Sequence, residues 1–127
     1  MESKVPSADD LRRRFPELRL LVLYGSRARG EAHAGSDWDF AYVSDAGFDE
    51  LGLRAALSSA LASDEVDLAA LDRAGGVLRY AVARDGKPLF ERSAGEFERF
   101  ALSAIRFWLD VEPVLRESQQ AMLERLG

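Results

Sequence analysis

The chain has 127 residues, of which 47% are hydrophobic and 31% are charged, and its formal net charge is −5 at pH 7. This length supports one domain with a buried core and is too short for two ordinary domains. The lack of cysteine excludes disulfides and thiolate metal sites, and a lone histidine, His33, excludes a multi-histidine zinc site. The acidic balance argues against direct nucleic-acid binding, which needs a basic face.

The chain contains no apolar run that approaches the roughly 18 residues of a membrane span. Its first residues are polar and charged, unlike a secretory signal segment. Without cysteine, a reducing compartment is the simplest setting. We therefore expect a cytoplasmic protein without membrane contact, folded as a single domain over residues 1–127.

The first half of the chain predicts a short helix and two strands. Ser7 as N-cap, with an acid three residues later, predicts a helix over residues 8–14. The apolar run at residues 20–24 predicts a short buried strand. After a polar link, residues 37–43 predict a second strand, which opens with two carboxylates.

The middle of the chain predicts a helix, two further strands and a short helix between them. Apolar residues at three-to-four spacing predict a helix over residues 48–61. A third strand is predicted over residues 66–71 and a short helix over residues 77–83. Residues 89–91 predict a fourth strand at a sheet edge, because Pro88 cannot donate a ladder hydrogen bond.

The remainder, from about residue 95 to residue 127, is predicted to be helical, with a kink or interruption at Pro113. One apolar face comprises Phe97, Phe100, Ala101, Ala104, Ile105, Trp108 and Leu109. This face is either core or a partner surface, and core is favoured because a small sheet needs covering. The element order predicts an α/β (α+β) domain in which helices pack on a small mixed sheet.

Two carboxylates separated by one residue, Asp37 and Asp39, mark the start of the second predicted strand. Alternate strand side chains point the same way, so these two share a face with backbones about 6.5–7 Å apart. Their oxygens can converge on one or two hard cations such as Mg2+. The alternative is a polar turn before the strand.

Gly25 and Ser26 end the first predicted strand and offer a turn for an anion. Glycine makes such a turn easy, and a strand-to-helix turn presents free N–H groups and the positive end of a helix dipole to a triphosphate. Ser26 is alternatively an ordinary N-cap. Tyr24, at the strand end, is interpreted as structural.

A third acid, Asp67, lies in an otherwise apolar predicted strand, between Val66 and Leu68. A buried carboxylate costs several kcal/mol unless it is paired or bound to metal, which favours a functional role. The alternative is an exposed acid at a strand end.

The spacing of Gly25-Ser26, ten residues, then Asp37-Trp38-Asp39 resembles the signature of the polymerase β-type nucleotidyltransferase superfamily. The longer strings at residues 25–31 and 36–40 are similar to the minimal nucleotidyltransferases (MNT), which are often paired with HEPN ribonuclease toxins. This resemblance implies a polymerase β-like fold with a C-terminal helical segment. Trp38 departs from the usual aliphatic residue, so it is expected to alter packing or to mark a partner contact.

The resemblance also implies roles for particular residues. It assigns catalysis and metal binding to Asp37, Asp39 and Asp67, and nucleotide binding to Gly25, Ser26, Arg27, Arg29 and Ser36. It places Arg79, Tyr80 and Arg84 at the border of the nucleotide pocket. By the same resemblance Asp67 deprotonates the attacking hydroxyl, and the cofactors are two Mg2+ ions with ATP as substrate. Arg27 and Arg29 are either phosphate ligands or surface charges.

The activity that the resemblance implies is Mg2+-dependent transfer of AMP from ATP to a tyrosine hydroxyl of a HEPN toxin, which neutralises the toxin. The partners are then ATP and the HEPN protein. Two alternatives stay open: a non-catalytic antitoxin that neutralises by binding, and transfer to a small-molecule hydroxyl such as that of an aminoglycoside. The sequence leaves open the acceptor residue, the base preference and the oligomeric state.

Overall fold

The computed structural model describes residues 5–32 and 35–126. Its elements, in chain order, are α1 (Ala8–Arg14), β1 (Leu18–Tyr24), α2 (Ser26–Arg29), β2 (Trp38–Ser44), α3 (Glu50–Leu61), β3 (Val66–Ala70), the 3-10 turn η1 (Leu71–Arg73), α4 (Gly76–Asp85), β4 (Lys87–Glu91) and α5 (Glu96–Leu126). All the predicted helices and strands are confirmed, with boundary differences of a few residues. Ser7 caps α1 as expected, since its side chain accepts a hydrogen bond from the Asp10 N–H.

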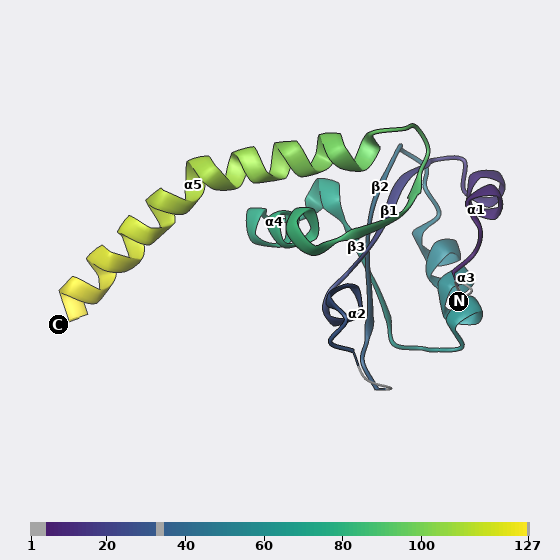
Figure 1. Cartoon of the computed structure of the whole chain (residues 1–127), viewed down its shortest axis with the longest axis horizontal. Coiled ribbons are helices and arrows are strands. Elements are labelled where there is room, and N and C mark those ends of the chain that lie inside the picture. The colour runs from purple at the N-terminus through teal and green to yellow at the C-terminus, as the bar shows by residue number, and fades with distance from the viewer. Residues whose placement is uncertain (1–4, 33–34, 127) are drawn as a thin grey trace.

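The four strands form one mixed sheet in the order β3-β2-β1-β4. β1 pairs antiparallel with both β2 and β4, whereas β2 pairs parallel with β3. The parallel pair requires a crossover, and α3 supplies it (Figure 1). The predicted α/β mixed sheet is therefore confirmed, and β4 lies at an edge, where Pro88 is tolerated.

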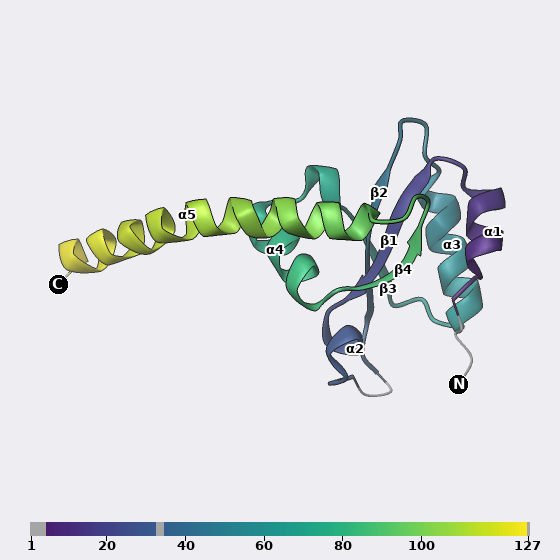
Figure 2. The ribbon, with the colours of Figure 1, turned by 45° about the horizontal axis from the view of Figure 1, so that its top comes forward.

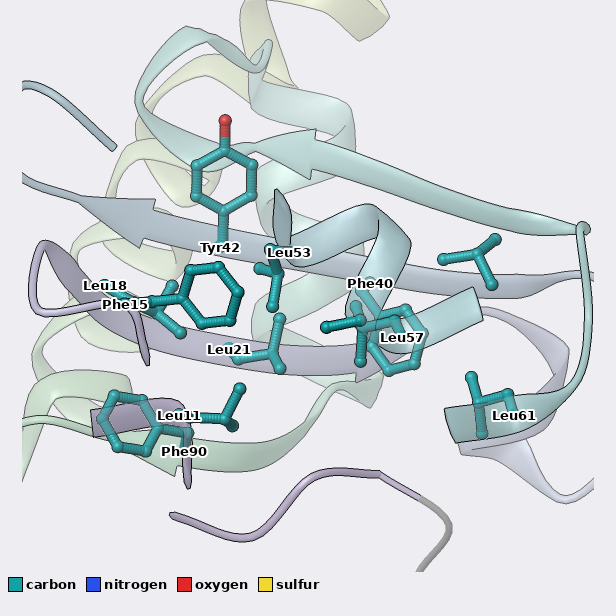
Figure 3. Close-up of a cluster of buried hydrophobic side chains, with 12 residues drawn as sticks. Leu11, Phe15, Leu18, Leu21, Phe40, Tyr42, Leu53, Leu57, Leu61 and Phe90 are labelled. Atoms are coloured by element: carbon teal, nitrogen blue, oxygen red, sulfur yellow. The ribbon is translucent and has the colours of Figure 1, made fainter. Parts of the chain in front are cut away.

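Helices cover both faces of this sheet (Figure 2). Alternate side chains of β1 point to opposite faces, so Leu21 joins a core with α1 and α3, whereas Leu20 joins one with α4 and α5. The α1/α3 core, drawn in Figure 3, comprises Leu11, Phe15, Leu18, Leu21, Phe40, Tyr42, Leu53, Ala56, Leu57, Leu61, Val66 and Phe90. The α4/α5 core comprises Leu20, Val22, Ala41, Leu71, Val82, Phe100 and Ala104.

The two ends of α5 have different environments. Phe100 and Ala104 are buried, but Leu109 is 67% exposed and every side chain from residue 113 to residue 126 is exposed. The first part of the predicted apolar face is thus core, and the last part is not. The helix runs through Pro113 without a break, so of the two predicted outcomes, a kink or an interruption, the interruption is wrong. The axis of α5 does change direction along its length (Figure 1). Among the described residues, no helix is both long and apolar enough to span a bilayer.

Candidate active site

The turn after β1 is shaped by glycine and lies against a carboxylate. Gly25 has a φ of +78°, and a Cβ built on it would come within 3.2 Å of the Asp39 Cγ and closer still to its Oδ2. Gly25 is also the N-cap of α2, so Ser26 is the first helical residue. The interpretation of Ser26 as an N-cap is therefore wrong. Because α2 has only four residues, its free N–H groups matter more than its dipole.

Asp39 and Asp67 are brought together by the register of the sheet. The parallel pairing of β2 with β3 sets Asp39 directly opposite Asp67, and the antiparallel pairing of β1 with β2 sets Tyr24 opposite Asp39. Phe40 and Leu68, one residue further along each strand, pack toward the α1/α3 core. By alternation, both carboxylates belong to the other face, at the strand ends nearest Gly25.

The charges at this edge act on one another. Burial raises the pKa of Asp39, the nearby carboxylates of Asp67 and Asp37 raise it further, and Arg29 lowers it. Burial also raises the pKa of Tyr24, and the charges of Asp39 and Asp67 add to that rise. The structure therefore brings all three predicted carboxylates into one electrostatic neighbourhood.

Asp67 differs from its predicted environment. It is exposed, whereas its neighbour Val66 is buried. The argument from a buried carboxylate therefore does not apply to it, and the alternative of an exposed acid describes its solvent contact correctly. Its register position beside Asp39 is what places it in the site.

The donor chemistry of these residues fits a hard cation. Carboxylate oxygens are the ligands that Mg2+ prefers, and two of them face each other across β2 and β3. Within residues 5–32 and 35–126, however, no group of three or more histidine, aspartate or glutamate side chains is arranged as a metal cage. The site thus supplies ligands of the right kind without a preassembled coordination shell.

The two predicted arginine ligands lie in different surroundings. Arg27 Nη2 and Nε donate to the Ser36 carbonyl at 2.8 and 3.3 Å, and its guanidinium carbon lies 3.9 Å from the centre of the Trp38 ring. Arg29 is exposed, pairs with Glu31 at 2.9 Å and lowers the pKa of Asp39. Of the two arginines, Arg29 is the one whose charge acts on Asp39.

Trp38 packs as its strand position predicts. Its side chain is half-buried against the α1/α3 core and stacks on Phe40 with the ring centres 6.2 Å apart. Its side chain therefore lies on the face of β2 opposite the carboxylates.

The three residues predicted to border a nucleotide pocket lie in α4 and make contacts within the described fold. Tyr80 stacks on Trp108 with ring centres 4.9 Å apart, and Arg79 donates to the Leu71 carbonyl. Arg84 pairs with Asp85 at 2.8 Å.

Sequence reasoning did not assign Tyr24 to the site. Its position directly before Gly25, at the end of a strand that pairs with the carboxylate strand, was the available signal. The structure sets it opposite Asp39 in the sheet register.

Comparisons with known proteins agree on one family. Residues 9–95 match the family model described as polymerase beta, nucleotidyltransferase. The protein adenylyltransferase MntA of Aphanizomenon flos-aquae (strain 2012/KM1/D3) is 34% identical over an alignment of 150 positions. This alignment covers 100% of this chain and 99% of that protein. The protein of the same name from Shewanella oneidensis is 34% identical over 117 residues, covering 90% and 80%.

Two solved structures are similar over most of their length. A toxin–antitoxin crystal structure with AMP-PNP gives a TM-score of 0.69 at 33% identity, covering 91% of each chain. A complex of the tri-AMPylated Shewanella oneidensis HEPN toxin with its MNT antitoxin gives a TM-score of 0.63 at 30% identity, covering 91% of this chain and 88% of the other.

Proposed function

Since the chain belongs to the polymerase β nucleotidyltransferase family, we propose that it transfers AMP from ATP to a HEPN toxin and so acts as its antitoxin. Both MntA relatives are protein adenylyltransferases, and one of them aligns with this chain over nearly its whole length. The similar structures include a complex with an ATP analogue and one with an AMPylated HEPN toxin. These relatives support adenylyl transfer to a protein over transfer to a small molecule.

The acceptor in this proposal is a tyrosine hydroxyl on the toxin. The complex of a tri-AMPylated HEPN toxin with an MNT antitoxin supports an acceptor that is carried on the partner protein. We place the reaction in the cytoplasm, where ATP and Mg2+ are available.

Each residue of the site has a task in this reaction. The free N–H groups after Gly25 receive the triphosphate together with the Ser26 hydroxyl, and Arg29 compensates the charge of the leaving pyrophosphate. Asp37, Asp39 and Asp67 would hold two Mg2+ ions, which, when bound, supply Lewis-acid stabilisation of the attacking and leaving oxygens.

The proton and bond changes follow from this arrangement. The tyrosine oxygen forms a bond to the α-phosphorus, the bridging bond to the β-phosphate breaks, and pyrophosphate leaves with that electron pair. Asp67 takes the hydroxyl proton, and its exposure lets an incoming side chain reach it.

The observation that carries the proposal is the register of the sheet. It sets Asp39 beside Asp67 while Gly25 leaves no room between its own backbone and the Asp39 carboxylate. The turn at Gly25 and the pair of Asp39 and Asp67 are thus adjacent, and nucleotidyl transfer needs both a phosphate-binding turn and a pair of acids.

The test combines the purified chain, ATP, Mg2+ and its proposed HEPN partner. We expect a mass increase of one AMP on a toxin tyrosine, located by peptide mass spectrometry, and loss of toxin ribonuclease activity. Asp37→Ala should abolish both, whereas Asp64→Ala, at an exposed acid of the α3–β3 link, should abolish neither. Neutralisation by Asp37→Ala without AMP transfer would instead identify a binding antitoxin.

A further inference from the structure

The side chain of Arg27 contacts the residues on both sides of Asp37, which are Ser36 and Trp38. Two of its nitrogens donate to the Ser36 carbonyl, at 2.8 and 3.3 Å, and this carbonyl belongs to the peptide bond that joins Ser36 to Asp37. Its guanidinium carbon stands 3.9 Å from the ring centre of Trp38, the residue that follows Asp37. A hydrogen bond from a charged donor is stronger than one between neutral groups. A guanidinium over an aromatic ring is also attracted to the ring face.

Asp37 has little other support from the sheet. The ladder between β2 and β3 begins at Trp38, whose N–H donates to the Glu65 carbonyl at 2.8 Å. The ladder between β1 and β2 ends at Asp39. Asp37 itself is exposed and precedes the strand, so its backbone direction depends on what holds Ser36 and Trp38.

The position of Arg27 makes this contact a link between the two halves of the site. Arg27 lies in α2, directly after Gly25 and Ser26, and Trp38 begins β2. Arg27 is half-buried, and its guanidinium contacts the Ser36 carbonyl and the Trp38 ring. Arg27 therefore joins the Gly25–Ser26 turn to the Ser36–Asp37 peptide and to Trp38 by direct side-chain contacts.

We propose that Arg27 is a positioning residue that aligns Asp37 with the Gly25–Ser26 turn, rather than a ligand of the nucleotide phosphates. This inference rests on the proposed adenylyl transfer. Misplacement of a reacting group by about 1 Å can lower the rate roughly 10²-fold. Loss of the Arg27 contacts should therefore lower kcat more than it weakens ATP binding.

The test uses Arg27→Met, Trp38→Leu and the double variant, with Arg12→Met as the matched control. Arg12 makes the same kinds of contact away from the site, since it lies over the Phe90 ring at 5.4 Å and donates to the Arg92 carbonyl at 3.4 Å. Adenylyl transfer to the HEPN partner is measured for kcat, ATP KM and the half-saturating Mg2+ concentration.

We expect Arg27→Met to lower kcat by about 10–10²-fold and to raise the half-saturating Mg2+ concentration, with ATP KM unchanged. The double variant should lose less than the product of the single losses, because both changes break one contact. A raised ATP KM with multiplicative losses would identify Arg27 as a phosphate ligand and overturn the inference. A wild-type chain that transfers no AMP would instead contradict the proposed function itself, and the inference with it.

A second readout does not depend on turnover. In a Trp108→Phe background Trp38 is the only remaining tryptophan, since the chain has two. Without ATP or Mg2+, Arg27→Met should increase acrylamide quenching of Trp38 fluorescence, and Arg12→Met should not. Equal quenching in both variants would show that Arg27 does not cover the ring and would also overturn the inference.

Discussion

Asp39 and Asp67 occupy paired positions in the parallel β2–β3 ladder, so two carboxylates stand side by side at one edge of the sheet. Like charges directly across a ladder destabilise it. The apo protein therefore carries an electrostatic cost at the residues proposed for catalysis. A divalent cation bound between these carboxylates would remove this cost.

The first prediction is that Asp39→Asn raises the stability of the apo protein at pH 7 while it abolishes activity. The pKa of Asp39 is raised by burial and then by Asp67 and Asp37, so the folded state disfavours its charged form. The charge of Asp39 therefore lowers the free energy of unfolding, and this effect is complete above the raised pKa of the folded state. It disappears as the pH falls through the pKa that Asp39 has in the unfolded chain. Because Asp39 is partly exposed, we expect a gain below about 1 kcal/mol, or a few degrees in Tm. The gain should shrink in thermal melts at pH 4.

Asp45 is the control, because its pKa is lowered whereas that of Asp39 is raised. A hydrogen bond from Arg92 lowers the pKa of Asp45, so its charge stabilises the folded state at neutral pH, and this contribution is lost as the pH falls through the lowered pKa. Asp45→Asn should therefore lower Tm at pH 7. A lower Tm in both variants would show that Asp39 is not under electrostatic strain.

The second prediction concerns ligands. Mg2+ with ATP should raise the Tm of the wild-type chain, because a ligand present at 100 times its Kd stabilises by about 2.7 kcal/mol. Asp67→Asn should reduce this shift, since one ligand of the cation is lost. ATP with a chelator should give a smaller shift than ATP with Mg2+ in differential scanning fluorimetry. Equal shifts with and without the metal would count against the carboxylates as Mg2+ ligands.

The third prediction separates backbone strain from contact at two glycines. Gly25 and Gly30 have φ values of +78° and +75°, but a Cβ on Gly30 would meet nothing within 4 Å, whereas one on Gly25 would overlap the Asp39 carboxylate. Gly30→Ala should cost only the left-handed backbone term of about 1–2 kcal/mol and should keep activity. Gly25→Ala should cost more and should lose AMP transfer, because it displaces Asp39. Chemical denaturation and the transfer assay measure both effects.

The fourth prediction concerns the two ends of α5. Phe100 is buried in the α4/α5 core, whereas Leu123 is 65% exposed. Phe100→Ala should destabilise the fold by about 3–5 kcal/mol. Leu123→Ala should change the free energy of unfolding by less than about 0.5 kcal/mol. A large loss in Leu123→Ala would show that the end of α5 packs on the domain.

The helices and strands were predicted well because each of them has a local sequence signal, such as a capping residue or a hydrophobic periodicity. Ser7 marks the start of α1, and the periodicity of residues 50–61 marks α3. The sequence left open whether Pro113 kinks or interrupts α5. The helix continues because one proline removes one hydrogen bond and a long helix retains the rest. How much of α5 is buried also depends on where the sheet ends. The periodicity of the helix sequence does not indicate this.

The acidic residues that the sheet brings together were named from the sequence, but their relative positions were not. The spacing of the carboxylates pointed to Asp39. The argument that pointed to Asp67, a buried acid in an apolar strand, does not hold, because Asp67 is exposed. The facing positions of Asp39 and Asp67 depend on the register between β2 and β3, which a sequence does not display. For the same reason, Arg27 and Arg29 were equivalent in the sequence, although one turns toward Trp38 and the other acts on Asp39.

The most direct measurement is the rate of AMP transfer from α-labelled ATP to the HEPN partner by Asp39→Asn, after its Tm has shown that it is folded. We predict transfer by the wild-type chain, intact transfer by Asp64→Asn, and a loss on the order of 10²–10³-fold or more in Asp39→Asn. A folded Asp39→Asn chain that labels the toxin at the wild-type rate would contradict the assignment of this carboxylate pair as the catalytic centre.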